Sequence, residues 1–479
     1  MSQSTAATAR GPRREHDFLG EMELADSCYY GVQTLRAVEN FHITGMPMSA
    51  EPQFIRAFAM VKKAAALANR DCGTLSEPVA RAIAAACDRL LNGELHDQFP
   101  TDLIQGGAGT SCNMNANEVI ANVALEVLGL PKGDYDVVHP NNHVNCSQST
   151  NDAYPTAFRL ALHAKISEYV DQLSALAQAF AAKGAEFATV LKMGRTQLQD
   201  AVPMALGDEF RGWSVTIGED VARMREAQSL LLEVNMGATA IGTGINAPEG
   251  YAQKCVDYLA QISGIPVTLA VDLIEATSDT GAYVQLSGTL KRSALKISKI
   301  CNDLRLLSSG PRAGLGEINL PRMQPGSSIM PGKVNPVIPE VVNQAAYYVV
   351  GMDVTVSMAA EAGQLQLNVM EPVIGFALFT SLRYMGNACL ALRTKCVAGI
   401  TANPQVCRDM VMNSIGIVTA LNPLFGYETC AAIAKEALQT GKSVHDLVVV
   451  ERQLLTQARW DEIFSFENLI RPRFLGVRY

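Results

Sequence analysis

The stretch LSGTLKRSALKISKICNDLRLL (residues 286–307) carries the pattern that decides the fold. Its apolar residues recur at steps of three and four, which places them on one stripe of an amphipathic helix. Ser309-Gly310-Pro311 follows and predicts the end of that helix, because glycine favours a helix C-terminus and proline cannot continue a helix. The stripe consists of Leu286, Leu290, Ala294, Ile297, Cys301, Leu304 and Leu307.

Two further stretches repeat this periodicity. A third helix is expected to begin near Pro339, since proline suits a first helical turn, and to run toward Met358. Long helices with such spacing pack nearly parallel, at crossing angles of about 20°. The predicted fold class is therefore mainly all-α, with a central long-helix bundle. The two stripes are Leu162, Ile166, Tyr169, Leu173, Leu176 and Phe180, and Val341, Val342, Ala345, Tyr348 and Val349.

The segments before and after the bundle predict two further domains. Shorter helical patterns at 52–70 and 77–92 alternate with loops rich in glycine and asparagine. Short helices punctuated by Asn422-Pro423 and Gly441 end the chain. The predicted domains are an N-terminal domain (1–145), a central helical bundle domain (146–400) and a small C-terminal domain (401–479).

Composition excludes several classes of protein. Of 479 residues, 48% are hydrophobic and 18% are charged, which predicts that partner subunits cover apolar surface and that the chain is a homo-oligomer. A net charge of −8 argues against a nucleic-acid partner. No run of about 18 uncharged apolar residues occurs, so no membrane span is predicted.

The N-terminus and the cysteines indicate a cytoplasmic protein. MSQSTAATARGPRREHDF (1–18) lacks an apolar signal core, and a disordered tail is favoured over a transit peptide because no amphipathic face is present. The 11 cysteines form no CxxC pair, so neither a zinc site nor a redox dithiol is indicated. Buried, reduced thiols are expected instead, including Cys112 and Cys146.

Hydroxyl, amide and glycine residues gather in four segments between helical stretches. Ser, Thr, Asn and Gln supply short donors, Lys333 and Arg195 supply positive charge, and glycines allow close approach to backbone N–H groups. This combination predicts a pocket for a small carboxylate, although single clusters of this kind are also ordinary turns and helix caps. The segments are GGAGTS (106–111), HVNCSQSTND (143–152), GRTQLQDAVPM (194–204) and GSSIMPGKVNP (326–336).

Two nucleotide-binding motifs fail on their spacing. In GSSIMPGKVN the Gly-Lys pair comes one residue late and Val334 replaces the hydroxyl that a phosphate loop requires. The glycines at 242 and 244 follow a helix-like stretch at 230–234 and precede Pro248, so the strand, turn and helix of a dinucleotide site are not expected.

GSSIMPGKVNP closely resembles the mobile signature loop of the aspartase/fumarase superfamily, and the other three segments resemble its remaining active-site blocks in the same order. The similarity extends across nearly the whole chain, through the stretches at 17–37, 231–246, 359–373 and 413–423. Within the superfamily the blocks look most like the ammonia-lyases that act on aspartate.

One position favours an ammonia-lyase over a fumarase. Fumarases have Thr-His where this chain has Thr196-Gln197, and their histidine pairs with a glutamate corresponding to Glu340. A histidine and glutamate pair can move protons, whereas a neutral amide only donates and accepts hydrogen bonds. Gln197 therefore suits a site that handles an amine. Fumarate hydratase and a non-catalytic structural relative remain the alternatives.

The resemblance implies a carbon–nitrogen lyase that converts L-aspartate to fumarate and ammonia without a cofactor or metal. It implies a homotetramer whose active sites are shared between subunits, with a dicarboxylate substrate. Ser327 would remove a proton from the β-carbon. By resemblance, the β-carboxylate falls to Thr110, Ser149, Thr150 and Ser328, the α-carboxylate to Thr196, Lys333 and Asn335, and the amino group to Asn151 and Gln197.

His139 and His143 in HPNNHVN have the spacing of a metal pair on a helix. Pro140 and the two asparagines make a helix there unlikely. The resemblance implies a secondary anion site instead, and a structural loop is the alternative.

Overall fold

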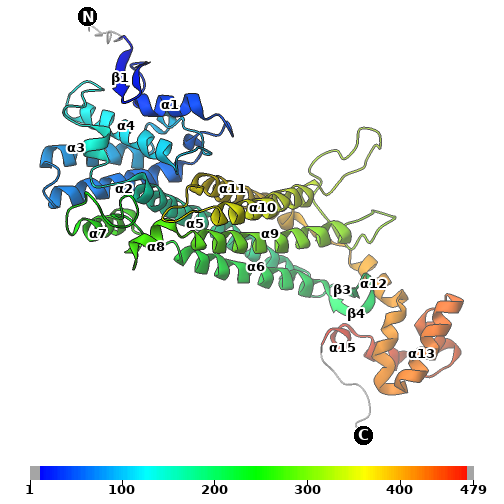
Figure 1. Ribbon diagram of the computed structural model, residues 1–479. Coiled ribbons are helices and arrows are strands. Elements are labelled where there is room, and N and C mark those ends of the chain that lie inside the picture. Colours follow the sequence, from blue (N-terminus) through cyan, green and yellow to red (C-terminus); the bar gives the residue numbers. More distant parts are fainter. Residues whose placement is uncertain (1–10, 472–479) are drawn as a thin grey trace, which may run out of the picture. The chain divides into compact units, whose positions relative to one another are not determined.

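The computed structural model describes residues 11–471, most of which lie in helices (Figure 1). Its contacts divide the chain into two units. The first unit contains the residues up to Val170 together with Ala222–Arg292 and Tyr347–Met385, and the second contains Asp171–Val221, Ser293–Ala346 and the residues from Gly386 onward. The domain boundaries expected near residues 145 and 400 stay predictions.

The predicted mainly helical fold with long helices is confirmed. The apolar stripe from Leu286 to Leu307 and the stripe from Leu162 to Phe180 are both buried along their whole lengths. In α10 (Val337–Glu361) the stripe is only partly as predicted, because Val342 and Val349 are buried whereas Val341 is exposed. The long helices are α5 (Thr150–Glu186), α6 (Leu206–Ser229), α9 (Gly281–Leu307), α10 (Val337–Glu361) and α11 (Glu371–Lys395).

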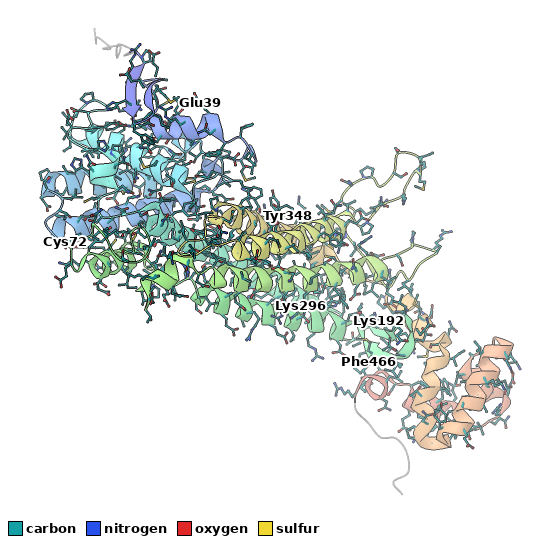
Figure 2. The ribbon with its side chains drawn as sticks, in the orientation of Figure 1. Glu39, Cys72, Lys192, Lys296, Tyr348 and Phe466 are labelled. Atoms are coloured by element: carbon teal, nitrogen blue, oxygen red, sulfur yellow. The ribbon has the colours of Figure 1, made fainter. Side chains whose placement is uncertain are left out.

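Polar contacts join these helices within each unit. In the first unit, Ser287 on α9 donates to the Asp353 carboxylate on α10 at 2.8 Å. Tyr348, labelled in Figure 2, lies 3.0 Å from the Thr380 hydroxyl on α11. In the second unit, Asn343 on α10 donates to the carbonyl oxygen of Ser298 on α9 at 3.0 Å. These contacts fix which faces of the helices meet.

The rest of the first unit consists of shorter helices around an aromatic cluster. The patterns at 52–70 and 77–92 form α2 and α3, as predicted. Phe54 on α2 lies 5.4 Å from the Tyr154 ring and 5.3 Å from the Phe379 ring, which joins α2 to α5 and α11. The helices are α1 (Val32–Asn40), α2 (Pro52–Asp71), α3 (Glu77–Leu91), α4 (Thr110–Val127), α7 (Tyr251–Ser263) and α8 (Leu273–Ser278).

The second unit includes a separate small core near the C-terminus. Trp460 stacks on Phe464 at 3.9 Å, and both pack in one cluster with Ile433 and with Leu191 and Met193 of a hairpin. Gly441 ends a helix with φ 71°, as its sequence position predicts. The elements are β3 (Leu191–Thr196), β4 (Gln199–Ala205), β7 (Ile318–Asn319), β8 (Thr401–Ala402), α12 (Pro404–Asn413), α13 (Asn422–Thr440), α14 (Gln457–Ile463) and α15 (Phe466–Ile470).

Two sequence interpretations were wrong. Residues 13–17 of the expected disordered tail form β1 (Arg13–Asp17), paired antiparallel with β2 (Gly20–Leu24), because Arg36 holds Asp17 through two hydrogen bonds; residues 1–10 of that tail lie outside the described part. The stretch before Gly242 is not helical, since β5 (Glu233–Val234) pairs with β6 (Thr268–Leu269) there.

Two helical stretches are long and apolar enough to span a membrane by length and composition alone. The stretch Glu371–Gly399 is 61% buried within the chain, which is the behaviour of a core helix. The other, Ile415–Thr440, has a mean hydropathy of 1.2 and is 28% buried. Neither is more than weak evidence for a membrane segment.

Candidate active site

The loop that carries Ser327 is tied together at its base. The Gly326 N–H donates to the Lys333 carbonyl oxygen at 2.8 Å, and Asn335 Nδ2 donates to the Gly326 carbonyl oxygen at 2.7 Å. Gly326 is required by this close approach, because an added Cβ would lie 2.6 Å from the Lys333 oxygen. Two hydrogen bonds therefore fix the base of the loop.

Backbone N–H groups surround the Ser327 hydroxyl. Ser327 Oγ accepts hydrogen bonds from the Met330 N–H at 2.9 Å and the Ile329 N–H at 3.2 Å. Two donors aimed at one oxygen stabilise negative charge on it, as in an oxyanion site. Ser327 is half-buried, while Ser328 and Lys333 are exposed.

Thr196 and Gln197 lie at the tip of a β-hairpin rather than in the loop that the sequence suggested. β3 and β4 pair antiparallel, and the two turn residues Gln197 and Leu198 have φ of 53° and 62°. Positive φ at both positions is the signature of a type I′ turn, whose twist matches that of the strands. Both predicted site residues are exposed there.

A buried carboxylate holds the base of this hairpin. Glu317 is 0% exposed and accepts Arg195 at 2.6 Å and Lys192 at 2.8 Å (Lys192 is labelled in Figure 2). Burial lowers the pKa of Lys192, but the carboxylates of Glu209 and Glu317 outweigh it and leave that pKa raised. The charge of Arg195 is therefore balanced by Glu317 and supports the hairpin.

Thr110 is the first residue of α4 and follows three residues in the left-handed region, Gly107, Ala108 and Gly109. Its hydroxyl donates to the Gly107 carbonyl oxygen at 2.8 Å, and the residue is exposed. Thr110 thus presents its hydroxyl at the surface at the N-terminus of α4, the end of a helix that favours an anion.

Ser149, Thr150 and Asn151 form the start of α5, and neighbours orient each of them. Thr150 Oγ1 accepts from Asn113 Nδ2 at 3.2 Å. Asn151 Nδ2 donates to the Ala240 carbonyl oxygen at 2.7 Å, which leaves the Asn151 Oδ1 atom as an acceptor. The first unit therefore brings Thr150 and Asn151 together with fixed orientations.

The sequence interpretation missed two buried charges behind this corner. Lys62 Nζ donates to the amide oxygens of Asn113, Asn145 and Gln148 at 2.7, 2.9 and 2.8 Å, and burial lowers its pKa to about 7. Asp152 accepts the Ser149 N–H at 2.9 Å, and burial raises its pKa to about 6. Lys62 lies in an alanine-rich helix, VKKAAA, where a lysine usually reaches solvent, so only the three-dimensional contacts could reveal it.

The histidine segment differs from its prediction. Pro140–Val144 forms a short π-helical turn, although the proline and asparagines argued against a helix. Two histidine side chains stabilise the turn. His139 Nδ1 accepts the Asn141 N–H at 3.0 Å, and His143 Nδ1 accepts the His139 N–H at 2.8 Å. Burial lowers the pKa of both rings. Within the described residues, no group of three or more His, Cys, Asp and Glu side chains could hold a metal.

The two cysteines inside the candidate segments differ in burial. Cys112 is buried and accepts from Gln105 Nε2 at 3.0 Å, and burial raises its thiol pKa to about 11. Cys146 is half-buried. The raised pKa of Cys112 argues against a reactive thiolate there, since reactivity needs a lowered pKa.

The predicted site residues thus fall into three groups: the starts of α4 and α5, the hairpin tip, and the Ser327 loop. The first group lies in the first unit, and the other two lie in the second. Each group presents hydroxyl, amide or ammonium donors, which suit carboxylates.

Comparison with known proteins covers almost the whole chain. Residues 20–351 match a family described as Lyase, and residues 417–471 match one described as Fumarase C C-terminus. The chain is 58% identical to aspartate ammonia-lyase of Escherichia coli over 468 residues, covering 98% of each protein. It is 59% identical to the Pseudomonas fluorescens aspartate ammonia-lyase, covering 99% of each.

Solved structures have the same fold. A Brucella melitensis protein described as fumarate lyase:delta crystallin bound to cobalt has a TM-score of 0.94 at 54% identity, covering 96% of this chain and 100% of that one. A class II fumarase from Schistosoma mansoni has a TM-score of 0.89 at 33% identity, covering 95% and 98%.

Proposed function

Since this chain belongs to the lyase family of aspartate ammonia-lyases and fumarases, we propose that it removes ammonia from L-aspartate to give fumarate, with Ser327 as the base. The chain is a carbon–nitrogen lyase. The observation that carries the role of Ser327 is the pair of N–H groups, from Ile329 and Met330, that donate to its Oγ.

A serine needs such donors to act as a base. Its hydroxyl is almost fully protonated at neutral pH, so the alkoxide must be stabilised where it forms. The Ile329 and Met330 N–H groups meet this need without any histidine. The Ser327 alkoxide takes the proton from the β-carbon, and the electron pair moves into the β-carboxylate to give an enediolate. When the double bond forms, the C–N electron pair leaves with nitrogen and the ammonium departs as ammonia.

The carboxylates bind to the donors at the three groups of residues. Thr110, Ser149, Thr150 and Ser328 hold the β-carboxylate, where charge grows during the reaction and donors therefore lower the barrier most. Thr196, Lys333 and Asn335 hold the α-carboxylate, with the lysine supplying the charge.

Two amides recognise the amino group. Asn151 presents Oδ1 to an ammonium because Ala240 already occupies its Nδ2. Gln197, at the exposed hairpin tip, adds a second neutral amide. Neither neutral amide can take a proton from water or give one to a leaving hydroxyl, which separates this site from that of a hydratase.

Ser327→Ala tests the base directly. We expect turnover of L-aspartate, followed by fumarate absorbance, to fall at least about a thousandfold, the upper range for loss of a general base. Ser308→Ala, at the end of α9, is the matched control and keeps full activity. An alanine variant that retains most of its turnover rules out Ser327. Absorbance change from L-malate but not L-aspartate assigns the chain to fumarate hydratase, and silence with both points to a structural relative.

The enzyme acts as a homotetramer with active sites shared between subunits. An exposed apolar stripe on α10 supports a subunit contact: Tyr347, Val354 and Met358 are 61%, 61% and 63% exposed. Water-exposed stripes of this kind mark association surfaces. Light scattering should give about four times the chain mass of 51.4 kDa.

Complementation tests whether sites are shared. Ser327→Ala and Thr150→Val chains, each inactive alone, are denatured together and refolded. Shared sites restore part of the activity, since some sites then receive Ser327 and Thr150 from different, intact chains. Mixtures as inactive as the separate variants contradict the shared-site arrangement.

We also place the enzyme in the cytoplasm. Most of its cysteines are buried thiols, which a reducing compartment preserves. Cell fractionation with an antibody against the chain tests this location.

A further inference from the structure

A small polar pocket lies beside Ser149 in the first unit. Its volume is about 170 Å³, enough for a few molecules of the size of water or ammonia. Residues 147–149, which precede α5, border it on one side, and residues of the turn at 237–246 border it on the other. The polar residues of its lining are Ser147, Gln148, Ser149, Thr239 and Asn246.

Thr239 is the unusual member of this lining. It is 4% exposed, and its Oγ1 atom has no hydrogen-bond partner among the residues that the structure describes. A buried hydroxyl without a partner is destabilising unless a ligand or water satisfies it. Its φ of 57° is rare for a β-branched residue, and such strain concentrates at functional sites.

Asp152 fixes the position of Thr239 relative to the candidate site. The carboxylate is 0% exposed and accepts three backbone N–H groups, from Thr239 at 2.9 Å, Gly237 at 3.1 Å and Ser149 at 2.9 Å. The turn and the start of α5 are therefore held by one buried side chain, and the pocket between them is preorganised.

The chemistry of the lining suits an amine better than a carboxylate. No lining residue is a lysine, arginine or histidine, so the pocket offers no cation to an anion. Gln148 offers no free acceptor, because its Oε1 atom accepts from Lys62 Nζ. The hydroxyl oxygens of Ser149 and Thr239 and the amide oxygen of Asn246 are acceptors for N–H groups. Asn151 does not line the pocket but is tied to it, because its Nδ2 atom donates to the carbonyl oxygen of Ala240, which does.

We infer that this pocket is the subsite for the substrate amino group and for ammonia in the reverse reaction, with Thr239 as a further substrate-binding residue. This inference rests on the proposed function. The Thr239 hydroxyl accepts a hydrogen bond from the ammonium or donates one to ammonia, which satisfies its unpaired oxygen. The pocket also gives ammonia a place next to the α-carbon when fumarate is aminated.

The test is the amination of fumarate by the full-length enzyme, with KM measured separately for ammonium chloride and for fumarate. Thr239→Val keeps the branched shape and removes the hydroxyl. We expect it to raise the KM for ammonium about tenfold or more, the effect of losing a hydrogen bond to a charged group, and to change the KM for fumarate less than about twofold. Thr239→Ser restores the hydroxyl and the KM. Thr243→Val, on an exposed residue of the same turn, is the matched control.

Unchanged KM for ammonium in Thr239→Val, or an equal rise in both KM values, overturns the inference. If Thr239→Val does not fold, Asn246→Gly takes its place, because glycine accepts the φ of 66° at this position while removing the lining amide. It should also raise the KM for ammonium selectively, and an unchanged value overturns the inference. A wild-type enzyme that does not aminate fumarate at all would instead contradict the proposed function.

Discussion

Asn335 closes the loop of Ser327, since its Nδ2 donates to the Gly326 carbonyl oxygen at 2.7 Å. Asn335→Asp replaces this donor with a carboxylate that repels the same oxygen. We expect kcat/KM to fall about a hundredfold, equivalent to about 2.7 kcal/mol, because the loop then no longer holds Ser327 in place and the new carboxylate repels the α-carboxylate of the substrate. Melting should change by less than about 2 °C, as expected for an exposed loop. Asn92→Asp on the exposed end of α3 is the control, and a loss of activity that only parallels unfolding argues against this role.

Gly109 cannot be replaced without displacing a buried ring. An added Cβ would lie 2.2 Å from the Tyr154 ring, and φ is +91°. Gly109→Ala should therefore destabilise the protein by about 3 kcal/mol or more in denaturant unfolding. Gly129→Ala, just beyond the other end of α4, is the control: φ is +75° but nothing lies within 4 Å, so only about 1 kcal/mol of backbone strain is expected. Equal effects of the two changes would show that the Tyr154 contact is unimportant.

Glu317 compensates two cations at the hairpin, the buried Lys192 and the half-buried Arg195. Glu317→Gln removes the charge that faces Arg195 and Lys192, and we expect a loss of about 3 kcal/mol in the free energy of unfolding, because one buried charge partner is removed. The exposed pair of Arg211 and Asp208 gives the contrast, and Asp208→Asn should change stability by less than about 1 kcal/mol. A stable Glu317→Gln protein would mean that solvent already screens the hairpin cations.

Lys62 makes stability depend on pH. Burial lowers its pKa from 10.5 to about 7 in the folded chain, so between these values the unfolded chain holds a proton that the folded chain has released. The contribution of Lys62 to stability is therefore present above the unfolded pKa and is lost as pH falls toward 7. The stability of the wild type relative to Lys62→Met should rise with pH across this window, by up to about 1.4 kcal/mol per pH unit.

Lys63→Met is the matched control for this titration. Lys63 is the next residue along α2 and pairs with the half-exposed Asp88 at the surface. Its substitution should leave the pH dependence of melting as in the wild type. If the melting temperatures of wild type and Lys62→Met change with pH in the same way from pH 7 to 10, the buried titration of Lys62 is contradicted.

The sequence predicted the long helices well because the buried face of a helix can be recognised from apolar residues only three or four positions apart. Leu286 and Leu304 are far apart in the chain, yet each lies at a step of three or four from its neighbours in the stripe, and each is buried. The hairpin at Thr196 was missed because its turn residues, Gln197 and Leu198, are not the Asn-Gly pair that usually signals a type I′ turn.

The candidate site was only partly predictable for a different reason. Hydroxyl and amide residues could be recognised in their segments, but the groups that orient them come from distant parts of the chain. Lys62 reaches Gln148 from α2, and Ala240 reaches Asn151 from a turn. Such partners share no local pattern with the residues that they position, so only three-dimensional contacts reveal them.

The tie between Gly326 and Lys333 has a consequence for the entropy of substrate capture. A loop that is disordered before binding loses the freedom of each of its residues when the substrate arrives, about 1–2 kcal/mol per residue. A loop already joined at its base by Gly326, Lys333 and Asn335 loses far less. It can therefore close as a preformed flap, and more of the interaction energy with the substrate remains available for affinity and for lowering the barrier.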